Sequence, residues 1–239
     1  MARPDGAAPP WRDWRHVTKL DPDKSLPDGV GYADVCATGT SAVVVGGSTG
    51  VTDRNLADVL SACADAELPV FQEPSTPEVV ADAAAVDGYL VPVVLNANDP
   101  FWLVGAHQQA VRQYPGHDWP RTDAEGYVVL NPDSTVATVT GADCDLDPAD
   151  VAAYATVAEQ LLGLDLVYLE YSGALGDDAV VAAAADALEA ATLFYGGGVH
   201  DAASARAKAT HADVVVVGNV LYDEGLDALQ ATVDGALDA

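Results

Sequence analysis

Eight short apolar runs, each of strand length and separated by segments with helical patterns, constrain the fold of this 239-residue chain most. The runs cover residues 16–21, 42–48, 70–75, 88–96, 126–131, 166–171, 193–199 and 212–219. Strands that are apolar on both faces and alternate with helices are typical of parallel sheets. Eight such units in about 240 residues predict a single α/β domain, a (β/α)8 barrel of the TIM type. An open, doubly wound sheet is the alternative.

Helices are expected in most of the intervening segments, several of which begin at an Asp or Pro that suits a helix start. These segments cover residues 53–67, 100–114, 148–162, 177–191, 201–210 and 223–237. The crossover at residues 76–87 has too weak a pattern to predict a full helix. Residues 1–10 are predicted to be a flexible segment that precedes a barrel domain of residues 11–239.

The chain is strongly acidic along its whole length. It has 10 Lys and Arg residues against 37 Asp and Glu residues, which gives a formal net charge of −27, and only Lys19, Lys24 and Lys208 are lysines. At molar salt the Debye length falls to about 3 Å, so repulsion between so many carboxylates is screened. The composition therefore predicts the cytoplasm of a halophile, and it excludes nucleic acid as a partner because a phosphodiester backbone would be repelled.

Cysteine usage and hydropathy indicate the compartment. The cysteines Cys36, Cys63 and Cys144 are odd in number and widely separated, so they predict neither a disulfide framework nor a zinc site. No apolar run approaches the roughly 20 residues that span a bilayer. We expect a soluble, cytoplasmic protein that contacts a membrane surface at most transiently.

Polar residues or glycine-rich turns stand at the end of nearly every predicted strand, and the strand ends of a parallel barrel meet at one face. They are Asp21, Ser48, Glu73, Asn96, Asn131, Glu170, Ser172, Gly196, Gly197, Gly198 and Asn219. This clustering is what favours a closed barrel with its active site at that face.

Two glycine-rich turns follow the last two predicted strands. They are residues 196–198 and Gly218-Asn219, with Asp201 and Asp223 soon afterwards as helix starts. Glycine lets backbone N–H groups approach an anion, and barrels commonly hold phosphate after strands seven and eight. The pair of turns predicts a phosphate cradle, while a single such turn is equally consistent with a tight strand-to-helix connection.

The first predicted strand ends in a cation and a carboxylate that alternate along the chain. Lys19 and Asp21 therefore point to the same side, where Lys19 could meet a phosphate and Asp21 could bind Mg²⁺. Ser48, in the glycine-rich turn after the second strand, could add a hydroxyl ligand. The simpler interpretations are a Lys–Asp surface pair and a serine that bonds its own turn.

The sixth predicted strand places Tyr168, Glu170 and Ser172 on one face, and Leu169 and Tyr171 on the other. A carboxylate in that position could orient or deprotonate an alcohol, with the two hydroxyl groups holding neighbouring oxygens. A structural hydrogen-bond cluster is the alternative.

Four aromatic residues, Phe101, Trp102, Trp119 and Tyr127, could form an apolar wall for a long ligand, although aromatic residues at helical spacing more often pack in a core. The five histidines follow no metal-binding or catalytic spacing.

Several strings together resemble the geranylgeranylglyceryl phosphate synthase family, which includes heptaprenylglyceryl phosphate synthases. They are HVTKLDPDK at 16–24, YLEYSG at 168–173, FYGGG at 194–198 and VGN at 217–219, with further similarity at 73–75, 91–96 and 126–134. The resemblance covers about residues 11–235. It implies a phosphate-binding barrel of the haloarchaeal type that uses Mg²⁺ to join geranylgeranyl diphosphate to the C3 hydroxyl of sn-glycerol 1-phosphate, the first committed step of archaeal ether-lipid biosynthesis. A homodimer or a larger ring is also implied.

The resemblance also assigns residues. It implies glycerol phosphate binding by Lys19, Tyr168, Leu169, Glu170, Tyr171, Ser172, Gly173, Gly198, Gly218 and Asn219, and Mg²⁺ binding by Asp21 and Ser48. Glu170 and Lys19 are the expected catalytic residues, with Glu170 positioning the glycerol hydroxyl for capture of the allylic cation. The family more often has threonine in place of Ser48.

Three alternatives remain at this point. They are a relative with another prenyl chain length, a phosphosugar isomerase or aldolase on the same fold, and a non-catalytic phosphate-binding protein.

Overall fold

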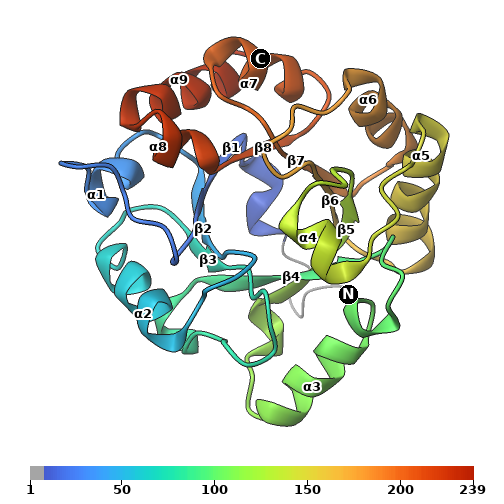
Figure 1. Ribbon diagram of the computed structural model, residues 1–239, viewed down its shortest axis with the longest axis horizontal. Coiled ribbons are helices and arrows are strands. Elements are labelled where there is room, and N and C mark those ends of the chain that lie inside the picture. Colours follow the sequence, from blue (N-terminus) through green and yellow to red (C-terminus); the bar gives the residue numbers. More distant parts are fainter. Residues whose placement is uncertain (1–7) are drawn as a thin grey trace.

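Eight parallel strands close into a barrel in the computed structural model, which describes residues 8–239, and helices form a ring around them (Figure 1). Each strand pairs with the next in sequence, and β8 pairs with β1. The predicted (β/α)8 fold is confirmed, and the open sheet is excluded. The strands are β1 (His16–Leu20), β2 (Ala42–Val45), β3 (Val70–Gln72), β4 (Gly88–Val94), β5 (Thr122–Val129), β6 (Leu166–Glu170), β7 (Thr192–Gly196) and β8 (Val214–Val217).

Two apolar clusters, one on each side of the strands, hold the barrel together. Tyr168 and Phe194 belong to the inner cluster, whereas their neighbours Leu169 and Tyr195 belong to the outer cluster. This alternation follows from the two-residue repeat of a strand. Strands buried on both faces explain the nearly continuous apolar runs in the sequence.

Two tryptophans fill the amino-terminal end of the barrel. Trp11 lies in the 3-10 helix η1 (Pro10–Asp13) and is fully buried, while the Trp14 ring packs edge-on against Phe71 at 5.3 Å between ring centroids. Both belong to the inner cluster, so solvent reaches the barrel from its other end. The predicted flexible segment falls on residues 1–7, which lie outside the described residues, and on residues 8–10, where η1 already begins at Pro10.

The helices follow the predicted order with shifted bounds. The α-helices are α1 (Tyr32–Cys36), α2 (Asp53–Ala62), α3 (Gly105–Gln113), α4 (Thr135–Thr140), α5 (Pro148–Thr156), α6 (Asp178–Ala187), α7 (Ala202–Ala209), α8 (Asn219–Asp223) and α9 (Leu226–Leu237). Shorter helical turns are η2 (Ala83–Ala85), η3 (Pro100–Trp102), η4 (Trp119–Arg121) and the π-helical η5 (Val157–Leu161). The weak third crossover forms only η2, as expected, and the prediction missed α1 and α4.

Three predicted bounds were wrong for identifiable reasons. The helix predicted for 100–114 is divided into η3 and α3, and the helix predicted from Asp223 begins only at Leu226, because Asp223 ends the short helix α8. Strand β5 starts at Thr122, four residues before the predicted start at Gly126. Its polar residues concealed it, including Glu125, which is buried although neither carboxylate oxygen has a hydrogen-bond partner among the described residues.

Burial, followed by the charge of Glu73, raises the pKa of Glu125 well above its ordinary value. Within residues 8–239, no helix has the length and apolar character that crossing a bilayer requires.

Candidate active site

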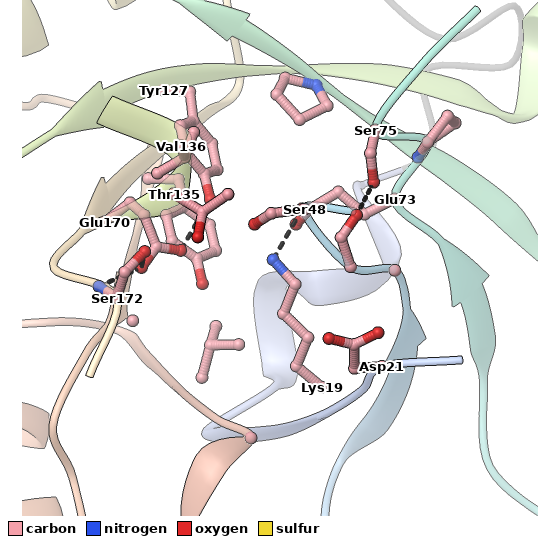
Figure 2. Close-up of a pocket in the computed structure, with 18 of the residues that line it drawn as sticks. Lys19, Asp21, Ser48, Glu73, Ser75, Tyr127, Thr135, Val136, Glu170 and Ser172 are labelled. Carbon is pink, nitrogen blue, oxygen red and sulfur yellow. Dashed lines mark hydrogen bonds and ion pairs between the residues drawn. The ribbon is translucent and has the colours of Figure 1, made fainter. Parts of the chain in front are cut away.

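A cleft of about 870 Å³ opens at the carboxyl ends of the strands. Residues that follow β1, β2, β3, β6, β7 and β8 line it, so the predicted convergence of the strand ends is correct for most of them. Helix α4 also lies at this mouth, where Thr135 and Val136 reach the cleft (Figure 2).

Asn96 and Asn131 were expected in the cleft but have structural roles instead. Asn96 is buried, and its amide bonds the backbone of Val129 and the carbonyl of Asp143. Asn131 donates to the Ser172 carbonyl and accepts from the Asp133 N–H. Both asparagines therefore stabilise the loops around the opening of the cleft through hydrogen bonds.

Lys19 enters the cleft from β1 and pairs with a carboxylate that the sequence did not connect to it. Its Nζ lies 2.7 Å from Glu73 Oε1, and the side chains are 21% and 9% exposed. Burial alone would lower the pKa of Lys19, but the attraction of Glu73 and Glu170 outweighs it and raises the pKa above its ordinary value. Lys19 is thus a permanent cation, and the expected alternative of a surface pair with Asp21 is wrong.

Glu170 is held on the opposite side of the cleft from Lys19 and Asp21 (Figure 2). Its Oε2 accepts from the Tyr127 hydroxyl at 2.7 Å, and its Oε1 accepts from the Ser172 hydroxyl at 2.9 Å and from the Ser172 N–H. Ser172 has a φ of 37°, which a residue other than glycine adopts at a cost of roughly 1–2 kcal/mol. The two bonds to Glu170 offset that cost and fix the carboxylate.

Tyr127 and Tyr168 are stacked beside Glu170, with ring centroids 4.7 Å apart. Burial and then the charge of Glu170 raise the pKa of both phenols well above the usual value. Both hydroxyl groups therefore stay protonated. The sequence placed Tyr127 only in an apolar wall, and its bond to Glu170 follows from the register, which sets Tyr127 opposite Tyr168.

Side chains from residues 168–173 divide as the strand alternation predicted. Tyr168, Glu170 and Ser172 line the cleft together with Gly173. Leu169 and Tyr171 do not line it, because their side chains pack in the outer cluster against the helices.

The glycine-rich turns after β7 and β8 lie side by side at the mouth. Gly197 has a φ of 145° and Gly198 a φ of 59°, a region that favours glycine. A Cβ at Gly198 would collide with the backbone of Leu175, so this turn is packed directly on the loop after β6. Gly198, Gly218 and Asn219 all line the cleft.

A buried lysine, whose role could not be predicted from the sequence, lies behind these turns. Lys208, on α7, is 2% exposed and donates to the Gly176 carbonyl and to Asp178 Oδ1. Its Nζ is 5.2 Å from the centroid of the Tyr195 ring. The Tyr195 hydroxyl accepts from the Gly176 N–H at 2.7 Å and donates to the Gly197 carbonyl at 2.9 Å, so this network ties the loops after β6 and β7 together.

The two residues predicted to bind metal lie on neighbouring loops. The Asp21 carboxylate covers the backbone of Gly47, where a Cβ would collide with it, and Ser48 follows directly. Both residues line the cleft. Among the described residues, no group of three or more His, Cys, Asp or Glu side chains forms a metal site. A metal held by Asp21 and Ser48 would therefore need ligands from a substrate or from water.

An apolar trough extends from the cleft toward α3. Val80, Val94, Ala110, Val111 and Val139 line it together with Trp102, Trp119 and Tyr127, so three of the four predicted aromatic residues are present. Phe101 is not among the lining residues and instead packs edge-on against Trp102. The aliphatic residues were not predicted, because a valine or an alanine has the same sequence pattern whether it lines a trough or packs in a core.

The sequence is similar to known proteins over nearly its whole length. Residues 10–236 match the sequence model of the PcrB family. The chain is 54% identical to the geranylgeranylglyceryl phosphate synthase of Halobacterium salinarum, over 96% of this chain and 97% of that protein. It is 45% identical to the heptaprenylglyceryl phosphate synthase of Geobacillus kaustophilus, over 93% of this chain and 92% of that protein.

A solved structure is also similar over nearly the whole chain. It is the crystal structure of (S)-3-O-geranylgeranylglyceryl phosphate synthase from Thermoplasma acidophilum in complex with its substrate sn-glycerol-1-phosphate. The TM-score is 0.83 at 25% sequence identity, and the match covers 95% of each chain.

Proposed function

The chain belongs to the PcrB family, and on that premise we propose that it is a prenyltransferase that joins geranylgeranyl diphosphate to the C3 hydroxyl of sn-glycerol 1-phosphate. The products are geranylgeranylglyceryl phosphate and diphosphate, and the reaction begins archaeal ether-lipid biosynthesis. One observation carries the proposal: the fixed carboxylate of Glu170 lies between a glycine-rich anion cradle and an apolar trough. A small phosphorylated alcohol and a long allylic chain would meet at that carboxylate.

The glycerol phosphate half of the site is proposed to use the cradle and the neighbouring polar side chains. The backbone at Gly198, Gly218 and Asn219 suits the phosphate, since glycine lets N–H groups approach an anion closely. Lys19 supplies a buried positive charge near the glycerol. The hydroxyl groups of Tyr168 and Ser172 line the same space and are available to the glycerol oxygens.

Glu170 is proposed to orient the C3 hydroxyl and accept its proton. As the allylic carbon–oxygen bond to the diphosphate breaks, the C3 oxygen forms the ether bond and its proton passes to the carboxylate. Such proton transfer by a positioned side chain contributes about 10²–10⁴-fold to a rate. Tyr127 and Ser172 keep the carboxylate in place throughout, because their three bonds leave it little freedom to turn.

Asp21 and Ser48 are the residues that we propose to hold Mg²⁺. Mg²⁺ is usually bound by one or two carboxylates together with substrate phosphates and waters, so the pairing of one carboxylate with one hydroxyl fits it. When bound, the ion supplies positive charge to the departing diphosphate. Asp21 is held for this role by its own turn, in which Oδ1 accepts from the Asp23 N–H at 3.0 Å.

The trough is proposed to hold the prenyl chain, and its rim to contact a membrane surface transiently. Val104, Val111 and Trp119, near the trough, are 64%, 49% and 47% exposed. Apolar side chains beside a lipid-binding groove suit exchange of a lipid substrate with a bilayer. Turnover on vesicles that contain the donor tests this, with Val104→Ser as the variant expected to reduce it.

The remaining proposals concern the setting of the enzyme. A second exposed apolar group, formed by Val157 and Leu161 in η5 and by Leu162 directly after it, supports a homodimer, which sedimentation measures directly. The net charge of −27 and the haloarchaeal relatives support the cytoplasm of a halophilic archaeon.

Product formation in buffer with molar KCl and Mg²⁺ tests the proposed reaction. We expect ether product from sn-glycerol 1-phosphate and the C20 donor, and much less from sn-glycerol 3-phosphate. A longer donor tests the heptaprenyl alternative that the 45% identical relatives support. If product formed without an allylic diphosphate, or if no donor gave product, the proposed prenyltransferase activity would be refuted. Either result would favour an isomerase, an aldolase or a binding protein.

A further inference from the structure

Two anionic substrates must share a mouth that is itself acidic. Carboxylates that line the cleft include Asp21, Asp23, Asp133, Asp223 and Glu224, in addition to Glu73 and Glu170. Among the described residues, two lysines line it, Lys19 and Lys24, and Lys19 is already ion-paired with Glu73 at 2.7 Å. Of these two lysines, Lys24 is therefore the one whose charge has no carboxylate partner and is available to a phosphate.

Lys24 is held at the mouth without a carboxylate partner. Its Nζ donates to Asn219 Oδ1 at 3.0 Å and lies 5.1 Å from the centroid of the Tyr222 ring. Within residues 8–239, no ion pair joins it to an acidic side chain. A cation fixed by a neutral amide and an aromatic face keeps its full charge for a ligand.

The turn that carries Lys24 is itself fixed. The Lys24 N–H donates to the Asp21 carbonyl at 3.0 Å, and the Asp21 N–H donates to the Tyr222 hydroxyl at 2.8 Å. Tyr222 thus contacts both the backbone of this turn and the ammonium group. The position of Lys24 beside α8 follows from the fold rather than from a freely moving side chain.

The same turn separates its charges between two loops. Asp21 and Asp23 face the loop after β2, where a Cβ at Gly47 or Gly50 would collide with their carboxylates. Lys24 faces the other way, toward Asn219 and the cradle after β8. The proposed metal-binding side of the turn is acidic, and the cradle side is basic.

The bond to Lys24 also orients Asn219. With Oδ1 turned to the ammonium group, Nδ2 is turned toward Gly173, where a Cβ would lie 3.2 Å from it. The Asn219 amide and the Lys24 ammonium group thus present donors at the same edge of the cleft.

We propose that Lys24 is a further substrate-binding residue, whose ammonium group binds the phosphate of glycerol 1-phosphate beside Asn219. This inference rests on the proposed function and assigns the unpaired cation to the cradle rather than to the prenyl diphosphate. Loss of a hydrogen bond to a charged group weakens binding by roughly tenfold or more.

Calorimetric titration of sn-glycerol 1-phosphate into the full chain in molar KCl tests the inference without turnover. We expect Lys24→Gln to raise the Kd about tenfold and Lys24→Arg to raise it less. Arg54→Gln is the matched control, because Arg54 is exposed, lies outside the cleft and changes the net charge equally. It should leave the Kd unchanged.

Steady-state kinetics assign the effect to one substrate. Lys24→Gln should raise KM for glycerol phosphate, with KM for geranylgeranyl diphosphate and the melting temperature unchanged, since Lys24 is exposed. A wild-type Kd in Lys24→Gln, or a rise confined to the KM of the diphosphate, would overturn the inference. A wild-type chain that binds no glycerol phosphate would instead overturn the proposed function, so the two failures are distinguishable.

Discussion

Replacing Glu170 by glutamine separates the charge of this carboxylate from its shape. In the structure Oε1 accepts from the Ser172 N–H and hydroxyl, and Oε2 accepts from the Tyr127 hydroxyl. A glutamine oxygen can take the place of Oε1, which the Ser172 N–H requires. The glutamine NH₂ then faces Tyr127, whose hydroxyl can rotate to accept instead of donate. All three contacts survive, and only the negative charge and the basic oxygen are lost.

The size of the effect follows from the role of the carboxylate. If Glu170 takes the proton of the C3 hydroxyl, its loss should lower kcat about 10²–10⁴-fold, or roughly 3–5 kcal/mol of transition-state stabilisation. Binding of glycerol phosphate should weaken no more than a few-fold, because the cradle is untouched. Removal of a buried anion beside an anionic substrate can even tighten it.

The assay is kcat with both substrates saturating in molar KCl and Mg²⁺, with the Kd for glycerol phosphate measured by calorimetry. Tyr127→Phe is the matched control, since it removes one bond to the carboxylate at 2.7 Å but leaves the charge. We expect it to lower kcat by only about tenfold. If Glu170→Gln kept kcat within threefold of wild type, or lost no more than Tyr127→Phe, Glu170 would not be the base.

Three further predictions concern the cradle and the barrel. Gly198→Ala should raise KM for glycerol phosphate at least tenfold, because the residue has a φ of 59° and its Cβ would collide with Leu175; an unchanged KM would remove this turn from the phosphate site. Lys208→Met should lower the free energy of unfolding by about 2 kcal/mol, less than the loss of a fully buried pair would, because Asp178 is 57% exposed. It should also raise KM for glycerol phosphate. A change in stability alone would show that the Lys208 network does not position the cradle. Burial lowers the pKa of His16 to about 3, so between that pH and about 6.5 the unfolded chain binds more protons than the folded chain. The free energy of unfolding therefore falls by about 1.4 kcal/mol for each pH unit as the pH is lowered through this window. His16→Gln should show a smaller slope of unfolding free energy against pH by that amount, and equal slopes would contradict the burial argument.

The barrel was predictable because its signals are local. Each strand is an apolar run with a two-residue repeat, and the residues at its end must lie at the mouth once the sheet is parallel and closed. That reasoning placed Lys19, Asp21, Glu170 and Asn219 in one cleft, as the structure has them. It missed only the start of β5, where the buried Glu125 interrupts the apolar pattern.

The partners of these residues were not predictable, because pairing across a barrel depends on the stagger of distant strands. Lys19 and Glu73 come from β1 and from the end of β3, and nothing in either segment indicates that their side chains meet at 2.7 Å. The Tyr127 bond to Glu170 likewise needs the register of β5 on β6. Asn131 stands at a strand end like the residues of the cleft, yet it bonds a loop backbone.

The composition itself carries a signal of the proposed cradle, the scarcity of lysine. A chain with 37 acidic residues and three lysines has almost no lysine on its surface, so each lysine that remains is one that the fold or the reaction needs. All three lie at the carboxyl ends of the strands: Lys19 and Lys24 line the cleft, and Lys208 lies buried behind the loops after β6 and β7. In a less acidic protein, dozens of solvated lysines would hide such a set. Where surface lysine is this scarce, the position of every remaining one is evidence about where anions bind, and here that evidence agrees with the glycine-rich turns found independently by their conformation.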